Sequence, residues 1–171
     1  MCKSGKPEKV KKPENDQPMK KIMYLILPVM FGFAGKIAAQ DKPIFPQGEI
    51  SKVNNHTGTV WLDELNKADS MLDLNVAMAT FAPGAKLDWH IHPAGQLLMI
   101  TDGTGYYQEK GKAIVVVHKG DVVRCIPGIP HWHGASPNSS FTYIAVSTNS
   151  ARNKTVWLQR VTDAEYNNIK Q

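Results

Sequence analysis

The sequence has very little cysteine. It contains two cysteines in 171 residues, Cys2 and Cys125, and Cys2 lies upstream of a predicted cleavage site for export. The predicted mature chain keeps only Cys125, and a single thiol cannot form an internal disulfide, so packing alone must hold the core. Cys125 lies in the apolar run 122–126, with no helix start or cluster of cations to lower its pKa. We therefore predict a buried, inert thiol.

The body of the chain also lacks an excess of charge. The formal net charge is +5, but residues 1–39 contain eight lysines and three acidic residues, which account for the whole excess. The remaining 132 residues carry 12 basic and 12 acidic side chains. A neutral body offers no basic patch to a phosphate backbone, so we expect no nucleic-acid partner.

The apolar run near the N-terminus is short. Residues 22–33 are almost wholly apolar but are interrupted by Pro28, and about 20 residues are needed to cross a bilayer. Lys20-Lys21 precedes this run, and the small residues of Ile37-Ala38-Ala39 follow it. A positive region, an apolar region and a small-residue site in this order are the three parts of a secretory signal.

We therefore predict that residues 1–39 are an N-terminal extension with a signal peptide, cleaved after Ala39. Residues 40–171 are then a single domain, periplasmic or secreted, with no membrane association after cleavage. The alternative interpretations of the apolar run are an uncleaved anchor or a buried helix.

The body shows the periodicity of strands. Apolar and polar residues alternate over 72–79, and turn residues such as Pro83-Gly84, Asp102-Gly103 and Lys119-Gly120-Asp121 separate the short apolar runs. The further predicted strands are 96–101, 104–108, 113–118, 122–126 and 141–147. Many short strands predict an all-β sandwich or barrel. Thr162–Glu165 has the spacing of a capping box and predicts a short C-terminal helix.

Four of the six histidines lie in two His-x-His pairs, His90 with His92 and His131 with His133. In a strand, residues two apart project from the same face, so each pair can direct both imidazoles at one point, as a metal ion requires. Gln96 begins the next predicted strand and can face the same point. His131 lies on a strand that can neighbour the first in a closed sheet.

The spacing of these residues resembles the cupin superfamily. Gly84, His90, His92, Gln96 and Gly103 match its first motif. The second motif is matched from Gly120 through Gly128 to His131, and the resemblance covers residues 58–168. It implies an all-β double-stranded β-helix, the cupin jelly-roll barrel, with a divalent metal inside its mouth.

Within the cupins, residues 56–63, 89–93 and 131–135 look most like small single-domain bacterial proteins that include manganese-dependent hydroxynitrile lyases. The implied metal ligands are His90, His92, Gln96 and His131. The implied cofactor is one divalent transition metal, manganese first, with iron, zinc, nickel or cobalt as alternatives, because the ligand types do not choose among them. The implied partners are a small-molecule substrate and a second copy of the chain, since small cupins commonly pair through their sheets and N-terminal strand.

The chain departs from the usual motifs at several positions. Gln96 stands where most cupins have Glu, as it does in the hydroxynitrile-lyase-like group, and Ile126 stands where Pro is common. The second motif also lacks its final Asn. Three imidazoles and an amide are all neutral, so a divalent ion keeps its full charge, which makes it a stronger Lewis acid but a less tightly held one. Arg124 replaces an aromatic residue and is expected in solvent, or at the mouth to steer an anion.

Two further residues are candidates for proton transfer. His133 shares a face with His131 and is interpreted as a partner that orients a ligand, a proton shuttle or a neutral base, or as a hydrogen-bonded barrel histidine. Tyr143 stands where the resembling lyases have a histidine that handles the substrate hydroxyl. A phenol with a pKa of about 10 is a poor base, so Tyr143 is expected to donate a hydrogen bond or to pack in the core.

The lone His56 and His118 are interpreted as histidines satisfied by ordinary hydrogen bonds.

Three functions remain open from the sequence. The first is metal-dependent lyase-like or related carbonyl and enol chemistry. The second is dioxygenation of a small phenolic or enolic compound. The third is a non-catalytic barrel that binds a small ligand or metal, because one fold hosts many functions.

Overall fold

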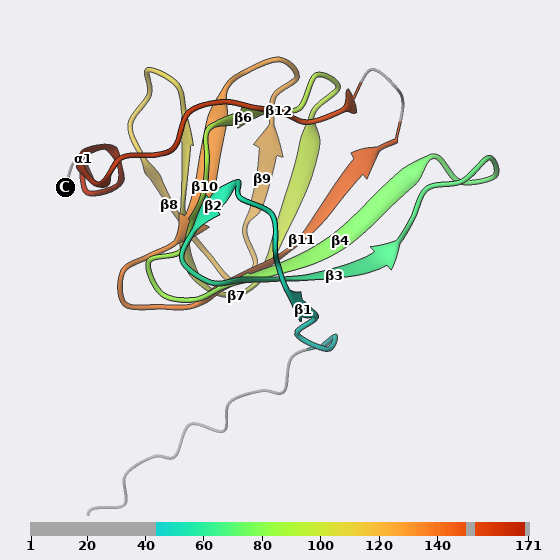
Figure 1. Ribbon diagram of the computed structural model, residues 1–171, viewed down its shortest axis with the longest axis horizontal. Coiled ribbons are helices and arrows are strands. Elements are labelled where there is room, and N and C mark those ends of the chain that lie inside the picture. Colours follow the sequence, from blue (N-terminus) through green and yellow to red (C-terminus); the bar gives the residue numbers. More distant parts are fainter. Residues whose placement is uncertain (1–43, 150–152, 170–171) are drawn as a thin grey trace, which may run out of the picture. The chain divides into compact units, whose positions relative to one another are not determined.

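A computed structural model describes residues 44–149 and 153–169 of the chain (Figure 1). The predicted extension and signal peptide, residues 1–39, lie outside the described residues and stay a prediction. Among the described residues, no helix combines the length and the apolar character that a membrane span requires.

The described residues form twelve strands and one short helix. The strands are β1 (Glu49–Ile50), β2 (His56–Thr57), β3 (Val60–Asn66), β4 (Leu74–Phe81), β5 (Lys86–Leu87), β6 (His90–Ile91), β7 (Gln96–Glu109), β8 (Val115–His118), β9 (Val122–Cys125), β10 (His131–Ala135), β11 (Phe141–Thr148) and β12 (Val156–Trp157), and the helix is α1 (Asp163–Tyr166). The predicted all-β fold with a short C-terminal helix is confirmed.

The strands form one antiparallel sheet that curls on itself, the jelly-roll arrangement (Figure 1). The hydrogen-bonded order is β1-β3-β4-β11-β7-β10-β5-β2, and β8 and β9 also pair with β7. The first half of β7 pairs with β11 and β9, whereas its second half pairs with β10 and β8. The single strand β7 therefore connects the two sides of the barrel.

The predicted turn at Asp102-Gly103 is wrong, because β7 runs through it without interruption. Gly103 has φ +76°, a left-handed conformation that glycine adopts without steric cost. A side chain there would also overlap the carbonyl oxygen of Ser140. The glycine thus bends one long strand between the two sides of the barrel, where the sequence pattern indicated two strands and a turn.

Two apolar clusters fill the fold. The barrel interior contains Val60, Ala79, Phe81, Ala85, Leu98, Ile100, Tyr107, Val117, Val123, Cys125, Ala135, Phe141 and Tyr143. The second cluster, beneath the C-terminal segment, contains Trp89, Tyr106, Ile114, Trp132, Val161 and Tyr166. Cys125 is a buried free thiol, as the sequence predicts, and Trp89 and Trp132 are buried packing residues.

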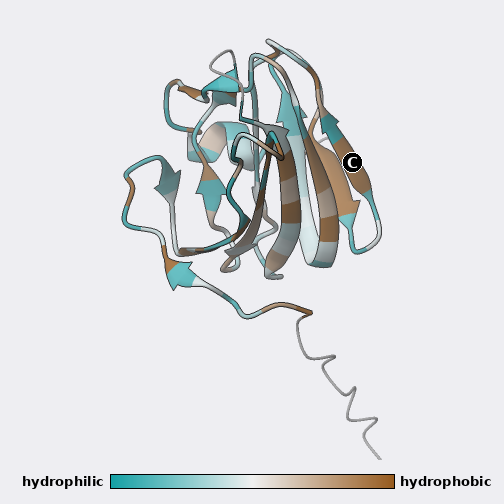
Figure 2. Cartoon of the chain, turned by 90° about the vertical axis from the view of Figure 1, so that its right-hand side faces the viewer, coloured by the Kyte–Doolittle hydropathy of each residue, from teal (hydrophilic) through white to brown (hydrophobic). Residues whose placement is uncertain are grey.

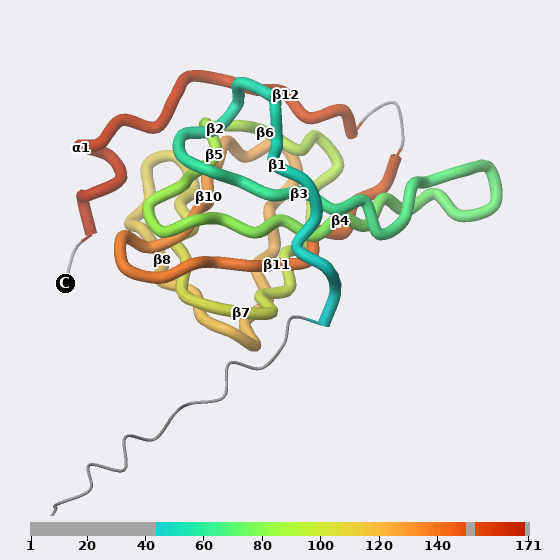
Figure 3. The backbone as a smooth tube through the Cα atoms, turned by 60° about the horizontal axis from the view of Figure 1, so that its bottom comes forward, coloured from blue at the N-terminus to red at the C-terminus, as the bar shows by residue number. Residues whose placement is uncertain are grey.

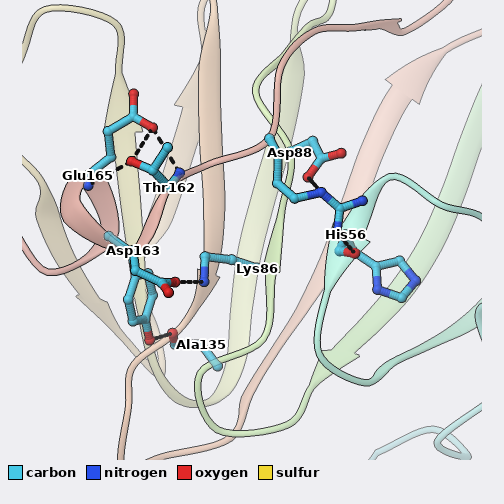
Figure 4. Close-up of polar contacts among 9 residues, drawn as sticks. His56, Lys86, Asp88, Ala135, Thr162, Asp163 and Glu165 are labelled. Atoms are coloured by element: carbon cyan, nitrogen blue, oxygen red, sulfur yellow. Dashed lines mark hydrogen bonds and ion pairs between the residues drawn. The ribbon is translucent and has the colours of Figure 1, made fainter.

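The C-terminal helix is capped as its sequence predicts. The Thr162 hydroxyl accepts from the backbone N–H of Glu165, and the Glu165 carboxylate accepts from the backbone N–H of Thr162 (Figure 4). The helix is tied to the barrel by the hydroxyl of Tyr166, which donates to the carbonyl oxygen of Ala135 at 2.7 Å. The C-terminal segment that leads into α1 is thereby held against the strand that carries His131 and His133.

Candidate functional site

Three of the four predicted metal ligands meet at one end of the barrel. His90 lies on β6, His92 follows that strand directly, and His131 begins β10. The two strands pair in antiparallel fashion with His131 opposite His90. One ring nitrogen from each of the three histidines lies within 4.8 Å of the other two. A cluster of imidazole nitrogens at this separation can hold a metal ion.

Backbone carbonyls orient two of these rings. The Nδ1 of His90 is 2.8 Å from the carbonyl oxygen of Asp88, and the Nδ1 of His131 is 2.9 Å from that of Ile129. Because a carbonyl can only accept, each Nδ1 carries the hydrogen, and the Nε2 lone pair is left free. The Nε2 of His131 is buried and has no hydrogen-bond partner in the described part of the chain. A ring fixed at Nδ1 with an open Nε2 has the form expected of a metal-binding histidine.

The three rings are held in the neutral form that metal binding requires. Burial, followed by the neighbouring His131, lowers the pKa of His90 to about 3. Burial likewise lowers the pKa of His92 to about 4, again with His131 as the second cause. Burial is also the largest influence on His131, whose pKa lies below its usual value.

Gln96, the fourth predicted ligand, lies in the wall of the same cavity as His90 and His92. It begins β7 and shares the face of that strand with Leu98 and Ile100, which are both buried in the barrel interior. Its amide is therefore on the interior side of the sheet, as the sequence predicts.

The cavity has a volume of about 200 Å³. The polar side chains in its wall are Ser51, Asn55, His56, His90, His92, Gln96, His133, Tyr143 and Thr155. None of the described lining residues is Asp, Glu, Lys or Arg. Arg124 is instead exposed, alternating with the buried Val123 and Cys125 of β9. A small neutral cavity suits a small uncharged ligand, because burying an unpaired charge is costly.

His133 is buried in this cavity with its hydrogen-bonding capacity unused. Its side chain is 2% exposed, and neither ring nitrogen has a hydrogen-bond partner among the residues described. Its ring centroid lies 5.1 Å from that of His90 and 5.1 Å from that of Tyr143. Buried nitrogens are rarely left unpaired, and such groups recur at functional sites. The alternative of a hydrogen-bonded barrel histidine does not match this environment.

Burial keeps both His133 and Tyr143 neutral. It lowers the pKa of His133 well below its usual value, with His90 as the next cause, and raises the pKa of Tyr143 well above its usual value. Neutral His133 has a lone pair that can accept a proton, and neutral Tyr143 has a hydroxyl that can donate a hydrogen bond.

The residues of the cavity wall that sequence reasoning did not place there include His56, Thr155 and Trp157. His56 is hydrogen-bonded at both ring nitrogens, to the carbonyl of Gly58 and the hydroxyl of Ser51, as its interpretation as an ordinary histidine required. Its place in the wall follows from the pairing of β2 with β5, which no local sequence pattern predicts. Thr155 and Trp157 belong to a segment whose only strand, β12, has two residues, too few for a periodic signal.

Comparisons with known proteins point to one family. The sequence profile of the cupin domain matches residues 77–147. A protein of Granulicella tundricola named (R)-mandelonitrile lyase is 42% identical over 110 residues, which cover 64% of this chain and 84% of that protein. The named relative is thus a lyase of the group that the sequence resembles.

Solved structures support the same fold. The crystal structure of a cupin-like protein from Thermotoga maritima is 40% identical, with a TM-score of 0.69, over 72% of this chain and 93% of that one. A cupin 2 conserved barrel domain protein from Rhodopseudomonas palustris is 22% identical, with a TM-score of 0.55, over 68% of this chain and 78% of that one. The second likeness concerns the fold alone.

Proposed function

The chain belongs to the cupin superfamily, and from this premise we propose that it is a metal-dependent enzyme that performs lyase-like or related carbonyl and enol chemistry on a small organic substrate. The observation that carries the proposal is the placement of His133. A buried, neutral imidazole with two unpartnered nitrogens lies beside a cluster of three histidines that can hold a metal, and it shares one small cavity with two of them, His90 and His92. The name of the Granulicella tundricola relative supports the lyase class.

The proposed metal-holding residues are His90, His92, Gln96 and His131. The free Nε2 of His131 and the neutral form of all three rings fit a divalent transition metal, with manganese proposed first. When bound, such an ion supplies a Lewis acid that polarises a substrate oxygen.

His133 is the proposed proton acceptor and donor. For a cyanohydrin, the hydroxyl proton moves to His133, the bond between the two carbons breaks with its electron pair going to cyanide, and His133 returns the proton to the leaving cyanide. Tyr143, whose ring meets that of His133 edge-on, donates a hydrogen bond to the substrate oxygen. Burial excludes bulk water from both groups, so the proton stays within the cavity.

Elemental analysis tests the metal first. The protein is purified without chelator or affinity nickel, beside a His90→Ala/His92→Ala variant and a His118→Ala control, whose histidine is exposed and bonded to Thr104 on another strand. We expect about one metal ion per chain in the wild type and the control, and none in the double variant. Equal metal content in all three proteins contradicts the site.

Substrate turnover tests the reaction class. The metal-loaded protein is given mandelonitrile, and the release of benzaldehyde and cyanide is followed. Oxygen uptake with enolic and phenolic compounds is measured in parallel. Cyanohydrin cleavage without oxygen uptake supports the proposal, whereas oxygen uptake indicates the dioxygenase alternative. A protein that binds metal or small ligands without turning over any substrate is the non-catalytic barrel.

We further propose that the outer face of the sheet pairs with a second copy of the chain. Leu97 and Met99 of β7 and Val122 of β9 are exposed apolar residues on neighbouring strands, and Met99 lies opposite Val122. Leu74, also exposed, lies on β4, which β11 separates from β7. Figure 2 shows apolar bands crossing adjacent strands. An exposed apolar face of this kind is typical of a self-association surface.

Light scattering on Met99→Lys tests the dimer, with Val116→Lys on β8 as a control because Val116 is similarly exposed. We expect a monomer for the first variant and a dimer for the second and for the wild type. A monomeric wild type contradicts the proposal.

Export is proposed from residues 1–39 alone. N-terminal sequencing of protein recovered from the periplasm or medium is expected to begin at Gln40. Recovery of the intact N-terminus contradicts cleavage.

A further inference from the structure

A short segment near the C-terminus contacts two of the candidate ligands, through Thr155 and Trp157, and the turn between His92 and Gln96, through Asn153. The segment runs beside β6, to which its strand β12 is hydrogen-bonded (Figures 1 and 3). In that pairing Trp157 lies opposite His90. Asn153 and Thr155 precede β12, and their hydrogen bonds place them beside the turn that follows β6 and beside His92.

Asn153 fixes the turn that connects two of the candidate ligands. Its side chain is 8% exposed; its oxygen accepts from the backbone N–H of Ala94 at 2.8 Å, and its nitrogen donates to the carbonyl of Gly95 at 3.1 Å. Ala94 and Gly95 lie between His92 and Gln96. The position of both ligands therefore depends on a side chain that lies outside the barrel motifs.

Thr155 provides the hydrogen-bond partner of His92. Its hydroxyl oxygen is 3.3 Å from the Nδ1 of His92. The equivalent partners of His90 and His131 are carbonyls two residues earlier in the chain, whereas Thr155 follows His92 by 63 residues. If His92 presents its Nε2 to the cavity, its Nδ1 carries the hydrogen and donates to this hydroxyl.

Trp157 covers one face of His90. The two ring centroids are 4.9 Å apart with an interplanar angle of 39°. Trp157 is 41% exposed and also lines the cavity, whereas His90 is 1% exposed. Such a contact restricts the rotation of the His90 ring.

We propose that Asn153, Thr155 and Trp157 are positioning residues. Asn153 sets the turn from His92 to Gln96, Thr155 sets the orientation of His92, and Trp157 sets that of the His90 ring. This inference rests on the proposed metal site, and none of the three residues is proposed as a ligand. Partners that orient metal-binding side chains typically change metal affinity about 10- to 100-fold when removed. Residues 153–157 therefore contribute to metal affinity although they supply no ligand.

The sharpest test compares Thr155→Val, which keeps the shape but removes the hydroxyl, with Thr155→Ser, which keeps the hydroxyl. Thr101→Val is the matched control, since the Thr101 hydroxyl is bonded to the carbonyl of Thr142, on another part of the sheet. Manganese alone is titrated into each full-length protein. We expect binding at least about 10-fold weaker in Thr155→Val than in the wild type, and near-wild-type binding in Thr155→Ser and Thr101→Val. Thermal melting of the metal-free proteins checks that all are folded.

A second measurement needs no metal. Nitrogen-15 NMR of the histidine rings reports which ring nitrogen carries the hydrogen. In the metal-free wild type and in Thr155→Ser, we expect His92 to be protonated at Nδ1; in Thr155→Val we expect this preference to be lost while His90 keeps it. An unchanged His92 tautomer in Thr155→Val overturns the inference.

The two experiments separate this inference from the proposed function. If wild type and Thr155→Val bind manganese equally, the positioning role is wrong and the metal site stands. If no variant binds manganese but the tautomer of His92 changes as expected, the metal proposal fails and Thr155 still orients His92.

Discussion

His131 lies directly opposite His90 in the antiparallel pair of β10 and β6, and the two ring centroids are 4.4 Å apart. The sequence places these histidines in separate motifs, and the sheet brings them into contact. The backbone carbonyls of Asp88 and Ile129 orient the two rings in the same way. The two histidines are therefore equivalent parts of one candidate metal centre, and we expect the removal of either one to have the same effect on metal binding.

Replacing either His90 or His131 with Ala is expected to abolish metal binding, because each removes one of three converging nitrogens. Metal content after incubation with manganese and gel filtration measures the effect. His56→Ala is a second control, since His56 lines the same cavity but is hydrogen-bonded at both nitrogens. Full metal retention in either His90→Ala or His131→Ala shows that the ligand assignment is mistaken.

Gln96→Glu is expected to tighten metal binding. A carboxylate adds a negative charge to a ligand set that is otherwise neutral, and it attracts a divalent cation more strongly than an amide does. The same charge reduces the Lewis acidity of the centre, so turnover falls as affinity rises. Competition with a chelating dye measures the affinity. Weaker manganese binding in Gln96→Glu than in the wild type excludes Gln96 as a ligand.

His133→Leu is expected to lose activity and to keep or gain thermal stability. Removal of a general acid–base group typically lowers turnover about 10²- to 10⁴-fold. The native imidazole buries two unpartnered nitrogens, and replacing them with apolar atoms removes that desolvation cost. Thermal melting and cyanohydrin turnover are measured on the same preparation. A strongly destabilised variant indicates that His133 is a structural residue.

Cys125 is expected to resist alkylation in the folded protein. Burial raises the pKa of its thiol to about 12, so the reactive thiolate is scarce throughout the neutral range and increases only as the pH rises toward that value. Peptide mapping after iodoacetamide treatment at pH 8 distinguishes Cys125 from Cys2. We expect modification of Cys125 in denaturant and almost none without it. Rapid modification in the native state contradicts the burial of this residue.

The sequence by itself determined the fold class and most of the candidate ligands. Two His-x-His pairs on strands, with Gln96 at a fixed distance, predict a shared metal site because the alternation of a strand is a local property of the backbone. The capping box at Thr162 is local in the same sense and formed as predicted. Local patterns were misleading at Gly103, where a left-handed glycine bends a strand that the sequence divides in two.

Only the tertiary structure decided how the rest of the site is assembled. The hydroxyl of Thr155 reaches His92 from far along the chain. His133, in contrast, has no hydrogen-bond partner among the described residues. The residues next to each histidine in the sequence do not predict which of the two will have a partner. Both depend on which strands become neighbours in the curled sheet. Side-chain periodicity is fixed residue by residue, whereas contacts between distant segments are fixed by the packing of the whole barrel.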